Sequence, residues 1–258
     1  MTSRDPLRAF ITPRALKNIF HSVTQSYCKH PRWLIRLSAE ARDYFSVRES
    51  RNGTRRGHHD QAQVFVSTCM QRQLAAFVEQ PSRCTFLAAR DAVLRESPLP
   101  LLATELAELD KLLDQDQYQV LLDRLDTLPP SRVLSPHIHF LAAEAADALG
   151  NLADMELERC LFVITLRGLL ATGDGSRANP YIVCHVSDEH DILLALGRQS
   201  SRQSLVTDAD RLFDRIVCSD GREVWFDVTE ILSRPKLTRR QRAAVPKRPR
   251  RRPSRLSR

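Results

Sequence analysis

The chain has no apolar run long enough to cross a membrane. Its longest mostly apolar stretch, 161–166, is interrupted by Thr165 and ends at Arg167, whereas a helical span needs about 20 residues. No apolar segment typical of a secretory signal peptide follows Met1. We therefore expect no membrane span and a cytoplasmic location.

The cysteines do not form a Cys-x-x-Cys pair, because no two of the six are closer than 15 residues. The sequence thus lacks the paired thiols typical of zinc sites and of thiol–disulfide exchange. Cys160 lies in an apolar helical pattern, and Cys184 and Cys218 lie in strand-like patterns. We predict buried, reduced thiols, which suit a reducing cytosol.

Several sequence signatures of enzymes are also missing. There is no His-Glu-x-x-His zinc motif, no Asp-x-Asp-x-Asp-Gly calcium loop and no Gly-x-Ser-x-Gly nucleophile turn. The segment Gly-Asp-Gly-Ser at 173–176 lacks the lysine of a phosphate loop and follows a helical pattern instead of opening one. The C-terminal end of a helix repels phosphate. We interpret this segment as a helix end and turn, and we predict no cofactor.

Acidic residues are absent from the last part of the chain, 234–258, which carries 12 basic residues. Residues 1–63 hold 12 basic and 5 acidic residues, and 64–233 hold 15 basic and 26 acidic ones. An acidic body therefore lies between two basic flanks. The proline-punctuated tail cannot collapse, and no aromatic residue after Phe226 offers a base-stacking surface. Two interpretations stand level: a solvated charge run, and weak polyanion binding without sequence specificity.

The N-terminal flank, residues 1–69, is predicted to be a poorly ordered basic extension. The segment 52–59 is rich in helix breakers and has no apolar anchor. A narrow apolar stripe between residues 16 and 27 would also suit a basic surface-binding or targeting helix. Met70 stands where the globular pattern begins, so the flank is equally consistent with an overlong gene start.

The middle of the chain, 70–175, has apolar residues at helical spacing. Ser135 and Pro136 predict an N-cap and a first helical residue, and Gly150 predicts a helix end. Five helices are expected, over 85–96, 101–113, 116–128, 136–149 and 153–171.

The last two predicted helices resemble a tetratricopeptide repeat (TPR) unit. Small residues recur on the first of them, at Ala142, Ala143, Ala145 and Ala146, and Leu149-Gly150 follows. Small residues let a neighbouring helix approach closely. One unit, with at most a degenerate second, predicts no continuous peptide groove.

After residue 175 the pattern changes to a small mixed α/β segment, 176–233. A strand is predicted over 181–186, a helix over 188–196 with Ser187 as N-cap, and a short strand over 204–207. The turn Ser219-Asp220-Gly221 predicts a hairpin that joins 212–218 to 223–228. The expected fold class is α+β, mainly α, with TPR-like antiparallel helices and a C-terminal hairpin.

One group of residues has the chemistry of an active site: His185, Asp188, Glu189, His190 and Asp191. Metal or acid–base chemistry would need them to converge from different elements. We favour instead acidic residues that complement a helix N-terminus, with one partly buried histidine. A pocket joining His185, Glu189 and Asp174 would support the alternative, a hydrolase or metal-dependent enzyme.

Two further histidines, His137 and His139, lie two residues apart on the predicted helix 136–149. Their side chains therefore point from different faces and cannot bind one ion from that helix. We predict no catalytic, cofactor-binding or metal-ligating residue anywhere in the chain.

Taken together, residues 84–231 resemble an uncharacterised bacterial family, a domain of unknown function. The matching residues are Phe86, Arg90-Asp91, His139, Leu149-Gly150, 173–176, 188–191, 203–205, Asp214 and Phe226-Asp227. Family members usually carry tyrosine where this chain has His190. The resemblance implies TPR-like helices and a small β segment, but no activity, cofactor or substrate. We expect a non-enzymatic protein-interaction module with an unidentified protein partner.

Overall fold

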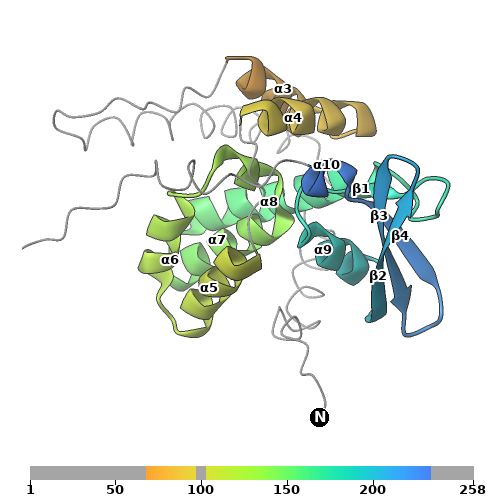
Figure 1. Cartoon of the computed structure of the whole chain (residues 1–258). Helices are drawn as coiled ribbons and strands as arrows, with labels where there is room; N and C mark the ends of the chain where they lie inside the picture. The colour runs from red at the N-terminus through yellow and green to blue at the C-terminus, as the bar shows by residue number, and fades with distance from the viewer. Residues whose placement is uncertain (1–67, 97–102, 234–258) are drawn as a thin grey trace, which may run out of the picture.

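The computed structural model describes residues 68–96 and 103–233. Within these ranges the protein is mainly helical and carries a small mixed sheet at one side (Figure 1). The predicted α+β, mainly α fold is therefore confirmed. The helices are α3 (Thr68–Glu79), α4 (Arg83–Glu96), α5 (Ala103–Asp114), α6 (Tyr118–Leu125), α7 (Pro136–Ala148), α8 (Leu152–Leu170), α9 (Asp188–Ala195) and α10 (Thr229–Leu232), with a 3-10 turn at Pro130–Leu134.

The predictions for the basic flanks concern mostly residues outside the described ranges. This applies to 1–67, including the apolar stripe between 16 and 27, and to the tail, 234–258. Residues 68 and 69 begin α3, a helix that the sequence analysis did not predict. Its buried residues Met70, Leu74, Phe77 and Val78 recur at helical spacing.

The helical part is built around α7 and α8, which are joined by a short turn at residues 149–151. The N–H of Gly150 bonds the Asp147 carbonyl, and its positive φ of 73° ends α7 as predicted. All four small residues of the TPR-like pattern are buried: Ala142, Ala143, Ala145 and Ala146. A close helix pair is thus present, while its assignment to the TPR class remains a prediction.

A glycine brings the first two helices against α8. A Cβ at Gly168 would lie 2.6 Å from Cζ of Phe77 and closer still to Cδ2 of Phe86. These two rings pack edge to face, with centroids 5.3 Å apart. Gly168 therefore sets how closely α3 and α4 approach the central pair.

The sheet contains β1 (Tyr181–Ile182), β2 (Ser200–Asp208), β3 (Arg211–Cys218) and β4 (Glu223–Asp227) in the order β1-β4-β3-β2. The predicted hairpin of β3 and β4 is confirmed, with Ile216 opposite Val224. β1 joins the other side of β4 in parallel. Helix α9 lies between the sheet and the helices α7 and α8 (Figure 1).

Two strand predictions were wrong in extent. The predicted strand over 181–186 keeps only two residues, because the N–H groups of Cys184 and His185 bond the Asp188 carboxylate instead of a strand. The predicted strand over 204–207 extends to 200–208, since β2 and β3 form a second hairpin. Its turn contains Ala209 at a φ of 51°, a backbone region that alanine seldom adopts.

The two predicted serine caps occupy their positions without a capping bond. Ser135 precedes α7 and Ser187 precedes α9, but neither hydroxyl accepts a helix N–H. Pro136 is the first residue of α7, as predicted.

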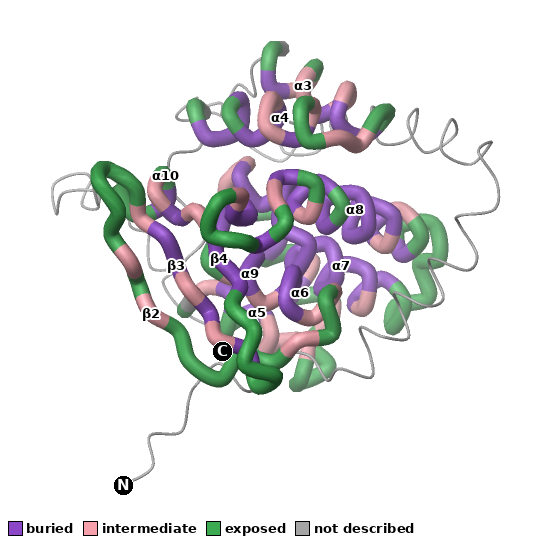
Figure 2. Tube along the Cα trace, turned by 90° about the vertical axis from the view of Figure 1, so that its right-hand side faces the viewer, coloured by how far each residue is buried: buried purple, intermediate pink, exposed green. Residues whose placement is uncertain are grey.

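Buried residues form one hydrophobic core that runs from Met70 to Ile231 (Figure 2). The predicted burial of Cys160, Cys184 and Cys218 is confirmed, and all three are free thiols. Burial raises the pKa of the Cys160 thiol to about 12. No helix within the described ranges is both long enough and apolar enough to cross a bilayer.

Arg90 of α4 connects the helical part to the sheet. Its Nε and Nη2 atoms donate to the Val183 carbonyl at 3.3 and 3.0 Å, and Nη1 donates to Oε2 of Glu230 at 2.5 Å. Only 4 % of Arg90 is exposed. This one guanidinium therefore joins α4, the segment after β1 and α10.

Candidate functional site

The candidate site is a buried network of histidines and carboxylates around α9. His185, Asp188 and Glu189 are fully buried and Asp191 is almost so, while His190 is half-buried. Asp188 and Glu189 lie in the first turn of α9, as predicted, and Asp191 lies there with them. All three side chains are buried.

Asp188 organises the loop before α9. Its Oδ2 atom accepts the N–H groups of Cys184 at 2.8 Å and His185 at 2.9 Å. Burial raises the pKa of Asp188, while nearby His185 and these backbone N–H groups oppose the rise. Asp188 thus turns the chain from β1 into α9.

His185, Glu189 and Asp174, which the alternative enzyme interpretation would join in one pocket, differ in burial and in partners. The Nε2 atom of His185 lies 3.0 Å from the Ser131 carbonyl, to which it donates. Asp174 is exposed. Hydrogen bonds from Ser176, first from its hydroxyl and then from its N–H at 2.8 Å to Oδ1, lower the pKa of Asp174. His185, Glu189 and Asp174 therefore bond to three different partners.

Glu189 forms a carboxyl pair with Asp214 of β3. The Nε2 group of Gln203 on β2 donates to both, at 3.2 Å to Glu189 and 2.5 Å to Asp214. Burial, then the Asp214 charge, raises the pKa of Glu189 well above its usual value. Burial also raises the pKa of Asp214, against the opposing effects of Gln203 and His190. Both shifts favour retention of a proton by the pair.

Asp191 belongs to a second cluster, with His137 of α7 and Asp110 of α5. The His137 Nε2 atom lies 2.9 Å from Oδ1 of Asp110. Burial raises the pKa of Asp191 to about 7, although the charge and backbone N–H of His137 lower it. Burial acts to lower the pKa of His137, but Asp110 and Asp191 outweigh it and raise the value. The cluster joins α5, α7 and α9.

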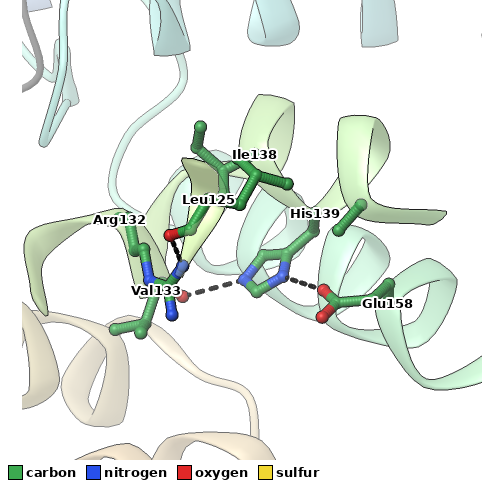
Figure 3. A pocket seen from close by; sticks show the side chains of 7 residues that line it. Leu125, Arg132, Val133, Ile138, His139 and Glu158 are labelled. Atoms are coloured by element: carbon green, nitrogen blue, oxygen red, sulfur yellow. Dashed lines mark hydrogen bonds and ion pairs between the residues drawn. The ribbon is translucent and has the colours of Figure 1, made fainter. Parts of the chain in front are cut away.

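A third buried group joins α7 to α8, through His139 and Glu158 (Figure 3). The Nδ1 atom of His139 lies 2.7 Å from Oε2 of Glu158 on α8, and its Nε2 atom lies 3.0 Å from the Val133 carbonyl. Because a carbonyl only accepts, Nε2 carries a hydrogen. The two histidines of α7 thus meet different helices, as their spacing predicts.

The small pocket beside His139 is too small for a substrate. Arg132, Ala142 and Glu158 help line it, and Arg132 donates to the Leu125 carbonyl across it (Figure 3). Its free space holds about one water molecule. The pocket therefore offers room for a water molecule beside the buried His139 and Glu158 side chains.

Some carboxylate oxygens in these clusters have no hydrogen-bond partner among the residues that the structure describes. They are Oδ2 of Asp110, Oδ1 of Asp188, Oε1 of Glu189, Oδ2 of Asp191 and Oδ1 of Asp214. Even so, among the described residues no three His, Cys, Asp or Glu side chains are arranged to hold a metal ion. The chemistry that this arrangement supports is proton retention and helix-to-helix bonding.

The sequence did not show which residues pair with this segment. Asp110 lies far from 185–191 in the chain and belongs to no motif, and Asp214 was named only among the residues that carry the family resemblance. Glu158 gave a usable signal, because it interrupts the apolar stripe of α8 and a lone acid there needs a buried partner. Arg90 was named only as part of the family resemblance, which did not imply its acceptors.

Comparison of the chain with protein-family models, curated proteins and solved structures gave no match. The resemblance to an uncharacterised bacterial family therefore remains a prediction. The function has to be argued from the chain's own chemistry.

Proposed function

We propose that this protein is a non-catalytic protein-interaction module. The observation that carries the proposal is that the side chains best suited to catalysis are buried and hydrogen-bonded. His137, His139, His185 and Glu189 are all buried and each bonds a partner on another element. Groups used in this way stabilise a scaffold, and the pocket beside His139 has room for about one water molecule.

The surface of α5 and α6 supports a basic partner. Glu108, Asp114, Asp116, Asp123 and Asp126 are exposed there. The basic residues of the two helices are Lys111 and Arg124, and the Arg124 guanidinium is 4.0 Å from Glu108. We name these five acidic residues the acidic helical surface. Such a surface attracts cationic protein segments and repels nucleic acid.

Pulldown with the full chain tests the proposal. The wild type and the charge-reversed variant Asp114→Lys/Asp123→Lys should be compared, with Asp220→Lys in the β3–β4 turn as control. We expect one set of basic proteins to be captured by the wild type and the control and lost with the reversed surface. Equal capture by all three would reject the acidic helical surface as the binding site.

The alternative, a hydrolase or metal-dependent enzyme centred on 185–191, makes a different prediction. Titration calorimetry with zinc, manganese and calcium would show a stoichiometric site that Glu189→Gln abolishes. The interaction module predicts no such site. A micromolar site that depends on Glu189 would replace our proposal with the enzyme.

A further inference from the structure

The sheet has one closed edge and one open edge. At the closed edge β1 pairs with β4, and the N–H of Trp225 donates to the Gly175 carbonyl at 2.9 Å. At the other edge, no described residue pairs with the outer side of β2. β2 is exposed except at the half-buried Ser204 and Val206 (Figure 2), and Leu205 at its centre is 57 % exposed.

Hydrogen bonds of Leu212 show which side of β2 is open. The Leu212 carbonyl accepts the Val228 N–H at 3.0 Å, and its N–H donates to Oγ1 of Thr229 at 2.9 Å. Both groups therefore point away from β2, so Leu212 and Thr207 form a non-hydrogen-bonded pair. It follows that the N–H and C=O of Thr207 face the open edge.

The period of two along a strand extends this result to Leu205 and Gln203. These three residues present their N–H and C=O groups outward, where water or another strand must satisfy them. The devices that usually protect an edge are proline, inward-pointing charge and a bulge. Residues 203–207 contain no proline and no charged residue, and the bulge lies earlier, near Ser201.

We propose that β2 pairs antiparallel with β2 of a second copy of this chain, about a twofold axis at Leu205. In this register Gln203 faces Thr207 of the second copy, and about six backbone hydrogen bonds form. The two sheets then become one continuous sheet, and each exposed Leu205 packs on its counterpart.

The charges of β2 favour this occupant. About an axis at Leu205, Arg202 stands opposite Asp208 of the second copy, and the same pair recurs on the other side of the axis. Both residues are exposed and share the sheet face that carries Arg215. A strand that is self-complementary in charge fits its own copy in this register. The proposal is independent of the acidic helical surface, which lies on other elements.

Sedimentation velocity of the full chain over a concentration series tests the pairing. We expect the wild type to move from monomer to dimer, and Arg202→Asp and Asp208→Arg each to raise the dimer dissociation constant at least ~10-fold through like-charge contacts. Arg222→Asp and Asp220→Arg make the same charge changes in the β3–β4 turn and should dimerise like the wild type.

Mixing the two edge variants is the decisive measurement. In the mixed dimer one chain is acidic at both edge positions and the other chain is basic at both, so each contact across the axis joins opposite charges. An equimolar mixture should therefore recover a dimer that neither variant forms alone. A mixture no more associated than its components, or a wild type that stays monomeric, would overturn the proposal.

A proline variant tests the backbone pairing itself. Leu205→Pro removes an N–H that β3 does not use and should give a folded monomer, with thermal melting as the check on folding. A folded Leu205→Pro variant that dimerises like the wild type would also contradict pairing through β2. A monomeric wild type would leave another protein or an undescribed segment of this chain as the occupant.

Discussion

At the scale of single residues, the protein's buried acids make its stability depend on pH in an unusual direction. Most carboxylates in proteins are stabilised as anions by folding. Here burial raises the pKa of Asp188, Glu189, Asp191 and Asp214. The folded state therefore binds more protons than the unfolded state above the unfolded pKa of about 4. Its stability falls as pH rises toward the folded pKa values.

Asp191 gives the clearest test, because its pKa of about 7 lies in an accessible range. The stabilising proton is fully bound below pH ~4 and is lost as pH rises through 7. The raised pKa of His137 acts in the same direction. Between pH 5 and pH 8 the free energy of unfolding of the wild type should decrease. We expect this decrease to be smaller in Asp191→Asn by roughly 2–4 kcal/mol.

Urea unfolding at several pH values measures this effect. Asp123→Asn, on the exposed face of α6, is the control and should keep the wild-type slope. A slope unchanged in Asp191→Asn would show that Asp191 is already ionised when folded.

The His139 and Glu158 pair allows a second test at this scale. His139→Ala removes the donor to the Val133 carbonyl and leaves Glu158 buried without its partner, which should cost about 2–5 kcal/mol. Glu158→Gln keeps a side chain that can donate to a neutral imidazole, so it should cost less. Chemical denaturation of both variants decides the order. Equal losses would mean that the pair needs a charged carboxylate.

At the scale of elements, close helix packing is the feature most open to test. In Gly168→Ala the new methyl group would overlap ring atoms of Phe86 and Phe77, with its Cβ 2.6 Å from Cζ of Phe77. We expect overpacking of about 1–3 kcal/mol. Ala171→Gly, at the exposed C-cap of α8, is a control that alters the same helix without touching these rings. Thermal melting of the two variants measures the difference, and a fully stable Gly168→Ala would contradict the close approach.

The elements also show what the sequence could and could not predict. Helices with clear breakers, such as α7 between Pro136 and Gly150, were placed within a residue or two. The β2–β3 hairpin was not predicted, because its turn has Ala209 at positive φ, where glycine or asparagine is expected. Helix α3 was not predicted, because it begins at Thr68, within the segment assigned to the poorly ordered basic flank.

The candidate site was predicted as a list but not as an arrangement. Residues 185–191 were identified, since their chemistry is local to one segment. Their contacts with Asp110, Gln203 and Asp214 could not be predicted, because long-range contacts leave no spacing signal in one sequence. The resemblance includes 203–205 and Asp214 but does not imply what they touch. The burial of the whole group also has no local signature, as acids at a helix N-terminus are most often solvated.

At the scale of the whole molecule, charge separation makes a prediction about polyanions. The tail, 234–258, carries 12 basic residues, whereas 64–233 carries an excess of acidic ones. We expect weak binding to any oligonucleotide through the tail, with each neutralised phosphate adding about −0.7 to −0.9 to the slope of log affinity against log salt. The acidic body should make the full chain bind more weakly than the tail peptide alone.

Fluorescence titration with two unrelated oligonucleotides tests this prediction. The full chain should bind both alike at matched salt, and a chain that ends at Ser233 should bind neither. Binding that survives removal of the tail, or a preference for one sequence, would contradict it.

The hydrogen bonds of Arg90 can form only late in synthesis of the chain, because their acceptors are translated long after Arg90. Its acceptors at Val183 and Glu230 follow it by 93 and 140 residues. At about 5–20 residues per second, the ribosome delivers the second acceptor roughly 7–28 s after Arg90. Through that interval the guanidinium must stay in water, because burial without an acceptor is costly. The face of α4 that carries Arg90 therefore stays hydrated during this interval. The hydrogen bond from Arg90 to Glu230 forms only after α10, the last helix of the described fold, has been synthesised.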